Sequence, residues 1–250
     1  TLIVRGGGDF RFTNEGLAIA QAAEAMDATV NMTRQTVHSM RTDAVGTVRV
    51  ACVPTAAHVL RPLVGEIAQA HDGLHVDLMS SISGIDLAKG DADIAVRTIP
   101  PKDPGLVVAY NFTWGSCLYA ARDYLEKHGR PQTPQDLRKH TLVRYGAPLL
   151  HAKAFGWVEQ YADPDRPATR VENSDSARVI IENGGGIGPL FCAVGDTCAP
   201  LERVFPEPFD QMESWVMYHE SVRGSQKLRV VLDALTAFLR ARRPQLTGVE

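Results

Sequence analysis

The chain has 250 residues, of which 44% are hydrophobic and 22% charged, with a formal net charge of −3. This composition is that of a globular chain with room for two compact units, and it excludes a collagen-like or low-complexity chain. No apolar run approaches the ~18 residues of a membrane helix, and no export-signal pattern opens the sequence. We therefore expect a reduced, cytoplasmic protein with no membrane partner. Its net charge gives no electrostatic indication of nucleic-acid binding.

The first residues predict a β-hairpin followed by the start of a helix. The β-prone runs at 2–5 and 9–12 are joined by three successive glycines, Gly6 to Gly8, which favour a hairpin tip. Thr13 follows the second run, and its hydroxyl is suited to cap the N-terminus of a helix.

Residues 14–45 predict one long helix with a narrow apolar stripe. No proline interrupts this segment, and its stripe advances in alternating steps of four and three residues, as in a coiled coil. Such a stripe is suited to cover a single partner helix, whereas the alternative is an ordinary helix lying on its own domain. The residues that we expect at a dimerisation seam are Ile19, Ala23, Met26, Val30, Val37 and Met40.

From Gly46 onward, strand and helix patterns alternate. In the first half, the expected elements are strands at 46–53, 74–81 and 92–97, a helix capped by Thr55 with Pro62 in its first turn, and a short helix at 85–89. In the second half, they are strands at 116–121, 141–145, 168–173, 186–191 and 215–220, and helices at 122–129, 133–140, 174–182 (capped by Ser174 or Asp175) and 225–242. This alternation predicts an α/β fold with mainly parallel sheets.

Five segments, taken in order, resemble the LysR-type transcriptional regulators. RGGGDFRFTNEG resembles the end of the family's DNA-binding wing, and GTVRVACVPT the opening strand of its effector-binding domain. LRPLVGEIAQAHDGLHVDL, GDADIAVR and ENSDSARVIIENGGGIGPLF resemble later strand and helix units of that domain. Together the segments span essentially the whole chain.

The resemblance implies two Rossmann-like lobes of the type II periplasmic-binding-protein kind, preceded by a long dimerisation helix. Residues 1–13 would be the remnant of a winged helix-turn-helix and 14–45 the linker helix. The first lobe would take 46–118 with 221–250, and the second lobe 119–220. Because the match begins inside the wing, we expect the recognition helix to lie outside these residues, with Arg5 and Arg11 as the remaining contacts to DNA.

The resemblance also implies a function and a set of partners. The chain would be the effector-binding and oligomerisation portion of a ligand-responsive bacterial regulator, acting as a homodimer or homotetramer. Its partners would be a small-molecule effector between the lobes, DNA through the N-terminal domain, and RNA polymerase. The alternative is a free-standing solute-binding protein of the same architecture, which the coiled-coil stripe and the absent export pattern disfavour.

Effector-binding residues are expected where strands end and helices begin, since the ligand sites of open α/β sheets lie there. The candidates are Thr55 and Ala56, Ser81 and Ser83, Arg97, Asn173 and Ser174, with Leu190 and Phe191 as an apolar wall. Free N–H groups at a helix start and the charge of Arg97 favour an organic acid. The alternatives are purely structural caps at Thr55 and Ser174 and a surface role for Arg97, and a carboxylate at Asp175 would oppose an anion.

No set of residues indicates catalysis, a metal or a cofactor. The glycines at 184–188 follow a helix and enter a strand, the reverse of the order that a nucleotide site needs. His71 and His75 do not share a helical face. Cys192 and Cys198 lie six residues apart, and we interpret them as buried, inert thiols rather than a redox pair. We therefore expect a binding protein and not an enzyme.

Overall fold

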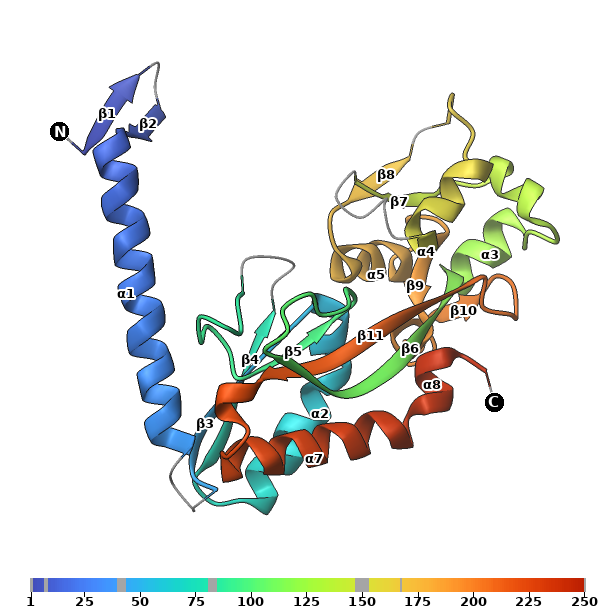
Figure 1. Cartoon of the computed structure of the whole chain (residues 1–250). Coiled ribbons are helices and arrows are strands. Elements are labelled where there is room, and N and C mark those ends of the chain that lie inside the picture. Colours follow the sequence, from blue (N-terminus) through green and yellow to red (C-terminus); the bar gives the residue numbers. More distant parts are fainter. Residues whose placement is uncertain are drawn as a thin grey trace.

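The computed structural model describes residues 2–6, 9–39, 44–80, 85–146, 153–166 and 168–249. A hairpin and a long helix lead into a mixed α/β body (Figure 1). The strands are β1 (Ile3–Gly6), β2 (Asp9–Phe12), β3 (Gly46–Cys52), β4 (Leu74–Ser80), β5 (Ile94–Arg97), β6 (Leu106–Ala121), β7 (Val143–Tyr145), β8 (Thr169–Val171), β9 (Gly188–Phe191), β10 (Leu201–Arg203) and β11 (Asp210–His219). The α-helices are α1 (Asn14–Ser39), α2 (Pro54–Ala70), α3 (Arg122–His128), α4 (Lys153–Gly156), α5 (Ser174–Glu182), α6 (Cys192–Gly195), α7 (Gln226–Ala241) and α8 (Arg243–Thr247). Three 3-10 helices are η1 (Pro134–Lys139), η2 (Trp157–Tyr161) and η3 (Glu220–Val222).

The N-terminal hairpin and the long helix form as the sequence predicts. β1 and β2 pair antiparallel, and the Thr13 hydroxyl accepts a hydrogen bond from the Gly16 N–H at 3.0 Å, which caps α1. The 26 residues of α1 make a rod of about 39 Å. Figure 1 shows α1 projecting from the body, which it contacts through η3 near its lower end.

One mixed sheet runs through the body in the order β10-β6-β11-β5-β3-β4, with β9 also paired to β6. β3 is parallel to β4 and β5, as the strand–helix alternation predicts, whereas β11 is antiparallel to β5 and β6. The second small sheet, β7 with β8, is again parallel. Each parallel pair is connected by a crossover, such as α2 between β3 and β4. The antiparallel strands β6 and β11 run between the two halves of the body.

Alternating side chains of β3 separate the two faces of the first half. Val48, Val50 and Cys52 are buried against α2 and α7, which contact each other, while Ala51 packs with Leu87 on the opposite face. The predicted helix at 85–89 is wrong, because this segment is a turn in which the Gly90 N–H donates to the Leu87 carbonyl. The apolar residues there are too few to form a helical face.

The fold has two lobes joined by long strands. The first lobe contains β3, β4, β5, α2 and α7, and the second contains β7 to β10, α3 to α6, η1 and η2. β6 and β11 run between the lobes (Figure 1), and they are longer than the strands predicted at 116–121 and 215–220. The buried Trp114 on β6 donates its Nε1–H to the Ser214 hydroxyl on β11 at 2.8 Å, which joins the two crossover strands.

Two details of the helices differ from prediction. Pro62 lies in the interior of α2 and not in its first turn. Proline has no N–H for the His58 carbonyl, and the Arg61 Nε donates to that carbonyl instead, at 3.3 Å. The segment at 133–140 forms a 3-10 helix, capped by a reciprocal pair of hydrogen bonds between Thr133 and Asp136.

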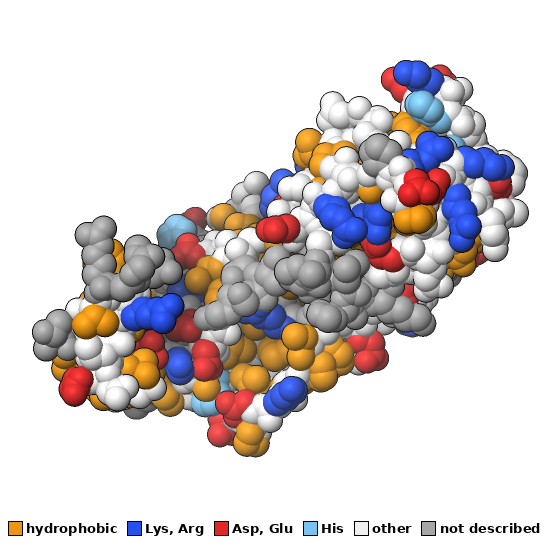
Figure 2. All heavy atoms as spheres, turned by 90° about the horizontal axis from the view of Figure 1, so that it is seen from above, with side chains coloured by type: hydrophobic (Ala, Val, Ile, Leu, Met, Phe, Trp, Pro, Cys, Tyr) orange, Lys and Arg blue, Asp and Glu red, His pale blue; other side chains and the backbone are white. Residues whose placement is uncertain are grey.

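Charged side chains of the second lobe are paired with one another. Arg122 and Arg130 both form ion pairs with Glu202, and Lys139 pairs with Asp136. On the face drawn in Figure 2, acidic and basic side chains are intermixed over the second lobe, at the right of the view. Such mixing gives no single-sign field on that face to attract a polyanion.

Candidate functional site

In the first lobe, the candidate site begins at the N-terminus of α2. β3 ends at Cys52, Pro54 is the first helical residue, and Thr55 and Ala56 follow with exposed fractions of 3% and 1%. The prediction that Thr55 caps the helix is wrong, because Val53 holds the N-cap position and no side chain caps α2. The first turn of α2 therefore keeps backbone N–H groups without a side-chain cap, as an anion site at a helix start needs.

Arg97 brings a positive charge to the same edge. It is the last residue of β5, and the parallel register places its neighbour Val96 opposite Cys52 at the end of β3. Burial raises the pKa of the Cys52 thiol to about 12, and the positive charge of Arg97 opposes that rise. The positive charge of Arg97 therefore lies near Cys52, two residues before the first residue of α2.

In the second lobe, the corresponding edge is the N-terminus of α5. The prediction that Ser174 or Asp175 caps this helix is wrong: the Asn173 Oδ1 accepts from the Ser176 N–H at 2.8 Å, so Asn173 is the cap. Ser174 lies beside Tyr145, whose hydroxyl donates to the Pro189 carbonyl at 3.3 Å and whose pKa is raised by burial. The Ser174 hydroxyl lies beside the helix terminus and the end of β7.

Leu190 and Phe191, predicted as an apolar wall, lie in β9 with exposed fractions of 1% and 4%. Phe191 is part of an aromatic cluster between the crossover strand and the second lobe. Its ring centroid is 5.4 Å from that of Trp114 and 5.5 Å from that of Phe155, which stacks on Tyr145 at 4.1 Å. This cluster gives the second-lobe edge a rigid apolar support.

A contact between the two lobes brings His58 of α2 beside α5. α2 contacts α5, and His58 in α2 is within the electrostatic reach of Asp175, Arg178 and Glu182 in α5. Burial lowers the pKa of His58, and the positive charges of Arg61 and Arg178 add to the effect. The predicted residues Ser81 and Ser83 lie outside the described residues.

Sequence reasoning missed Tyr145 and His58. Tyr145 is the last residue of the strand expected at 141–145, so the rule that strand ends line ligand sites could have found it. His58 carried no signal, because its partner helix is more than a hundred residues away in the chain.

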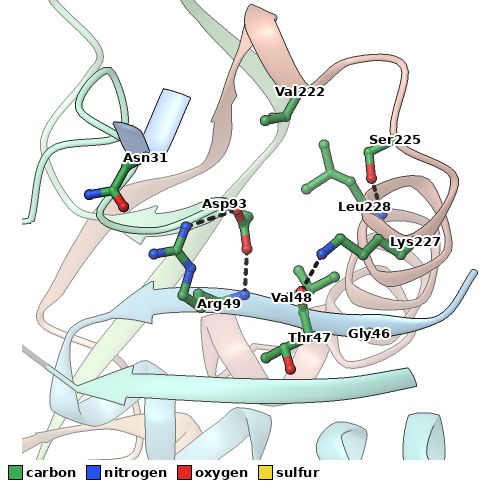
Figure 3. A pocket seen from close by; sticks show the side chains of 10 residues that line it. All are labelled: Asn31, Gly46, Thr47, Val48, Arg49, Asp93, Val222, Ser225, Lys227 and Leu228. Atoms are coloured by element: carbon green, nitrogen blue, oxygen red, sulfur yellow. Dashed lines mark hydrogen bonds and ion pairs between the residues drawn. The ribbon is translucent and has the colours of Figure 1, made fainter. Parts of the chain in front are cut away.

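A separate cavity of about 420 Å³ lies where α1 meets the first lobe (Figure 3). Its polar side chains are tied to one another or to backbone. Asp93 accepts from the Arg49 N–H at 2.8 Å and from its guanidinium at 3.2 Å, and the Lys227 Nζ donates to the Thr47 carbonyl at 2.6 Å. Asn31 of α1 borders the cavity opposite these groups, so the cavity adjoins the junction of the long helix and the body.

The predicted seam of α1 is open to solvent along the described part of the helix. Ile19, Met26 and Val37 have exposed fractions of 54%, 71% and 59%, and Ala23 and Val30 are exposed as well. Met40 lies outside the described residues. In the hairpin, Arg5 is on β1 and the exposed Arg11 on β2.

Two other kinds of feature are absent from the described ranges. No group of three or more His, Cys, Asp or Glu side chains there is placed to hold a metal ion. No described helix combines the length and the apolar character needed to cross a bilayer.

Two lobes joined by paired crossover strands, with a helix of one lobe in contact with a helix of the other, define a two-lobed class of α/β protein, in which small molecules commonly bind between the lobes. Residues 41–240 match the family model described as "LysR substrate binding domain". The chain belongs to this family and is the effector-binding portion of a LysR-type transcriptional regulator.

Individual relatives agree with this assignment. The chain is 24% identical over 233 residues to the transcriptional activator AaeR of Escherichia coli, covering 90% of this chain and 75% of AaeR. It is 30% identical over 192 residues to the transcriptional regulator CrgA of Neisseria meningitidis, covering 74% and 64% of the two chains.

Solved structures show the same fold. The regulatory domain of CrgA superposes with a TM-score of 0.66 at 23% identity, over 77% of this chain and 98% of that one. Full-length AphB of Vibrio cholerae, a virulence activator, superposes with a TM-score of 0.68 at 17% identity, over 95% and 83% of the two chains.

Proposed function

We propose that this chain binds a small organic acid between its lobes and passes the binding event to a DNA-binding domain through α1. The observation that carries the proposal is the contact between α2 and α5, one helix from each lobe, with Arg97 beside the end of β3 that leads into α2. Thr55, Ala56, Asn173 and Ser174 would line the site. Ser81 and Ser83 would complete the site, and Leu190 and Phe191 would form its apolar wall.

The chemistry of the two edges favours a carboxylate. The uncapped first turn of α2 supplies backbone N–H donors and the positive end of a 17-residue helix. Arg97 supplies a guanidinium, and Ser174 supplies a hydroxyl beside Tyr145. In this proposal the chain binds and releases the ligand without altering it. It needs no cofactor to do so.

We further propose that α1 pairs with α1 of a second copy through the exposed seam, giving a homodimer or a homotetramer. Thr33 lies on the same stripe, three residues after Val30 and four before Val37. Its hydroxyl donates to the Thr29 carbonyl at 2.8 Å, so its methyl group would face a partner helix. The assembly would act in the cytoplasm on DNA, which Arg5 and Arg11 would contact from the hairpin, and on RNA polymerase.

The effect of the ligand would follow from its preference for one arrangement of lobes or subunits over another. Only the difference between its affinities for the two arrangements changes their populations. A tenfold preference is worth about 1.4 kcal/mol and shifts the ratio of the two states tenfold.

The proposal is tested by a thermal-shift screen of small aromatic and aliphatic carboxylic acids on the unaltered chain and two variants. Thr55→Ala and Ser174→Ala are expected to abolish or reduce the shift that the best acid produces. Because Ser174 is not the cap of α5, its replacement leaves the Asn173 hydrogen bond intact.

Ser225→Ala is the matched control, since it removes a buried serine cap from α7, where the Leu228 N–H is the donor, and should leave the acid-induced shift unchanged. Equal shifts in all four proteins would overturn the assignment of the site, and a shift lost only in Ser225→Ala would move the site to the α1 junction.

A further inference from the structure

The four cysteines of the chain are all described, and two of them touch. Cys117 on β6 and Cys192 at the start of α6 are completely buried, and their Sγ atoms share a hydrogen bond at 3.6 Å. Cys198, expected to be buried like Cys192, is only half-buried and lies near Arg178 and Glu182. The two touching cysteines are 75 residues apart in the chain.

Polar groups surround this pair on one side. The Tyr119 hydroxyl donates to the Asp196 Oδ1 at 2.8 Å, and Arg203 donates to both oxygens of that carboxylate, at 2.8 and 2.6 Å. The hydrogen bond with Cys117 and the Arg203 charge lower the pKa of Cys192, and burial opposes that shift. Burial raises the pKa values of Cys52 and Cys198, to about 12 and about 11. Cys192 is therefore the thiol best suited to ionise.

Cys192 also lies directly under the end of the described chain. A methyl group added at Gly248 would come within 2.4 Å of the Cys192 Sγ, so the Gly248 backbone lies directly against the sulfur. Gly248 has φ +73° and ends the five-residue helix α8, and its carbonyl accepts from Arg203 at 3.0 Å. The following residue, Val249, is 41% exposed. Displacement of this one short segment would open the sulfur to a small solute.

We propose that Cys117 and Cys192 form a redox-active dithiol, which hydrogen peroxide converts to a disulfide between β6 and α6. In the first step, the Cys192 thiolate attacks one peroxide oxygen and the O–O bond breaks. The products are a sulfenic acid on Cys192 and hydroxide, which takes up the proton lost by the thiol. In the second step, the Cys117 sulfur attacks the Cys192 sulfur, and the hydroxyl leaves with the Cys117 proton as water.

These steps balance: two thiols lose two electrons and two protons, and one peroxide becomes two waters. The S–S bond needs the two sulfurs to approach from 3.6 Å to about 2.05 Å, a movement within the range of side-chain rotation. This inference does not depend on the proposed effector site.

The test treats the reduced 250-residue chain with hydrogen peroxide under native conditions, removes the peroxide, blocks the remaining thiols with N-ethylmaleimide in denaturant, and maps peptides without reduction. We expect a peptide that links Cys117 to Cys192, with two of the four thiols lost and the other two alkylated. Cys198→Ala is the matched control and should give the same cross-link. Cys117→Ala should stop at a Cys192 sulfenic acid that dimedone traps, and Cys192→Ala should give neither product.

Three results would overturn the proposal. They are oxidation of Cys198 with the pair left reduced, a cross-link that forms only after denaturation, and a disulfide that joins two copies of the chain. Because the main measurement is made on the unaltered protein, a variant that fails to fold does not affect the conclusion.

Discussion

The exposed stripe on α1 leads to a quantitative prediction for Val30→Glu. The Val30 side chain is 46% exposed in the single chain, so a partner helix would cover about half of it. Full burial of a valine is worth at least about 1.5 kcal/mol, so the loss is just under 1 kcal/mol in each copy. A symmetric dimer contains the change twice, and two facing carboxylates add repulsion. We therefore expect a loss of about 2–4 kcal/mol, which raises the dissociation constant about 30-fold to several hundred-fold.

Sedimentation equilibrium over a range of protein concentrations measures this change. Gln21→Glu is the matched control, because it places a carboxylate on an exposed position of the opposite face of the same helix. Association that is equally strong in the two variants would refute the seam, and so would a chain that is monomeric before any substitution.

Three further predictions concern the body of the protein. Arg97→Gln should weaken binding of the best acid about tenfold or more in titration calorimetry, because a charge-assisted hydrogen bond is worth about 1.5–3 kcal/mol, while Arg170→Gln on β8 should not. Asp93→Asn should lower the free energy of unfolding by about 1–3 kcal/mol in urea titrations, because this nearly buried carboxylate accepts two hydrogen bonds from β3; an unchanged midpoint would contradict its structural role. Burial lowers the pKa values of His58 and His140, so the unfolded chain binds more protons below about pH 6.5 and stability should fall from pH 7 to pH 5. Replacing both histidines with Gln should flatten that dependence.

Most of the fold could be predicted because its signals are local. The hairpin, α1 and the alternation of strands with helices follow from glycine, capping and periodicity patterns, and they form where expected. The failures are those in which distant residues decide the outcome. β6 extends back to Leu106 because β11 pairs with it from there onward. The sequence near residues 106–115 contains no pattern that predicts this pairing.

The candidate site shows the same division. Helix starts at 54 and 174 could be located to within two residues, but the capping residues were assigned wrongly, since Pro54 shifts the first turn of α2 and Asn173 competes with Ser174 at α5. The pairing of Cys117 with Cys192 could not be inferred at all, because it requires β6 to lie beside β9.

The proposed function depends most directly on where an organic acid binds, and hydrogen–deuterium exchange with the best acid from the screen measures this. We predict that the acid slows exchange in two peptides together, one covering the α2 N-terminus at 53–58 and one covering the α5 N-terminus at 173–178. Slowing confined to the α1 junction at 46–49 and 222–228, or to one lobe alone, would contradict binding between the lobes.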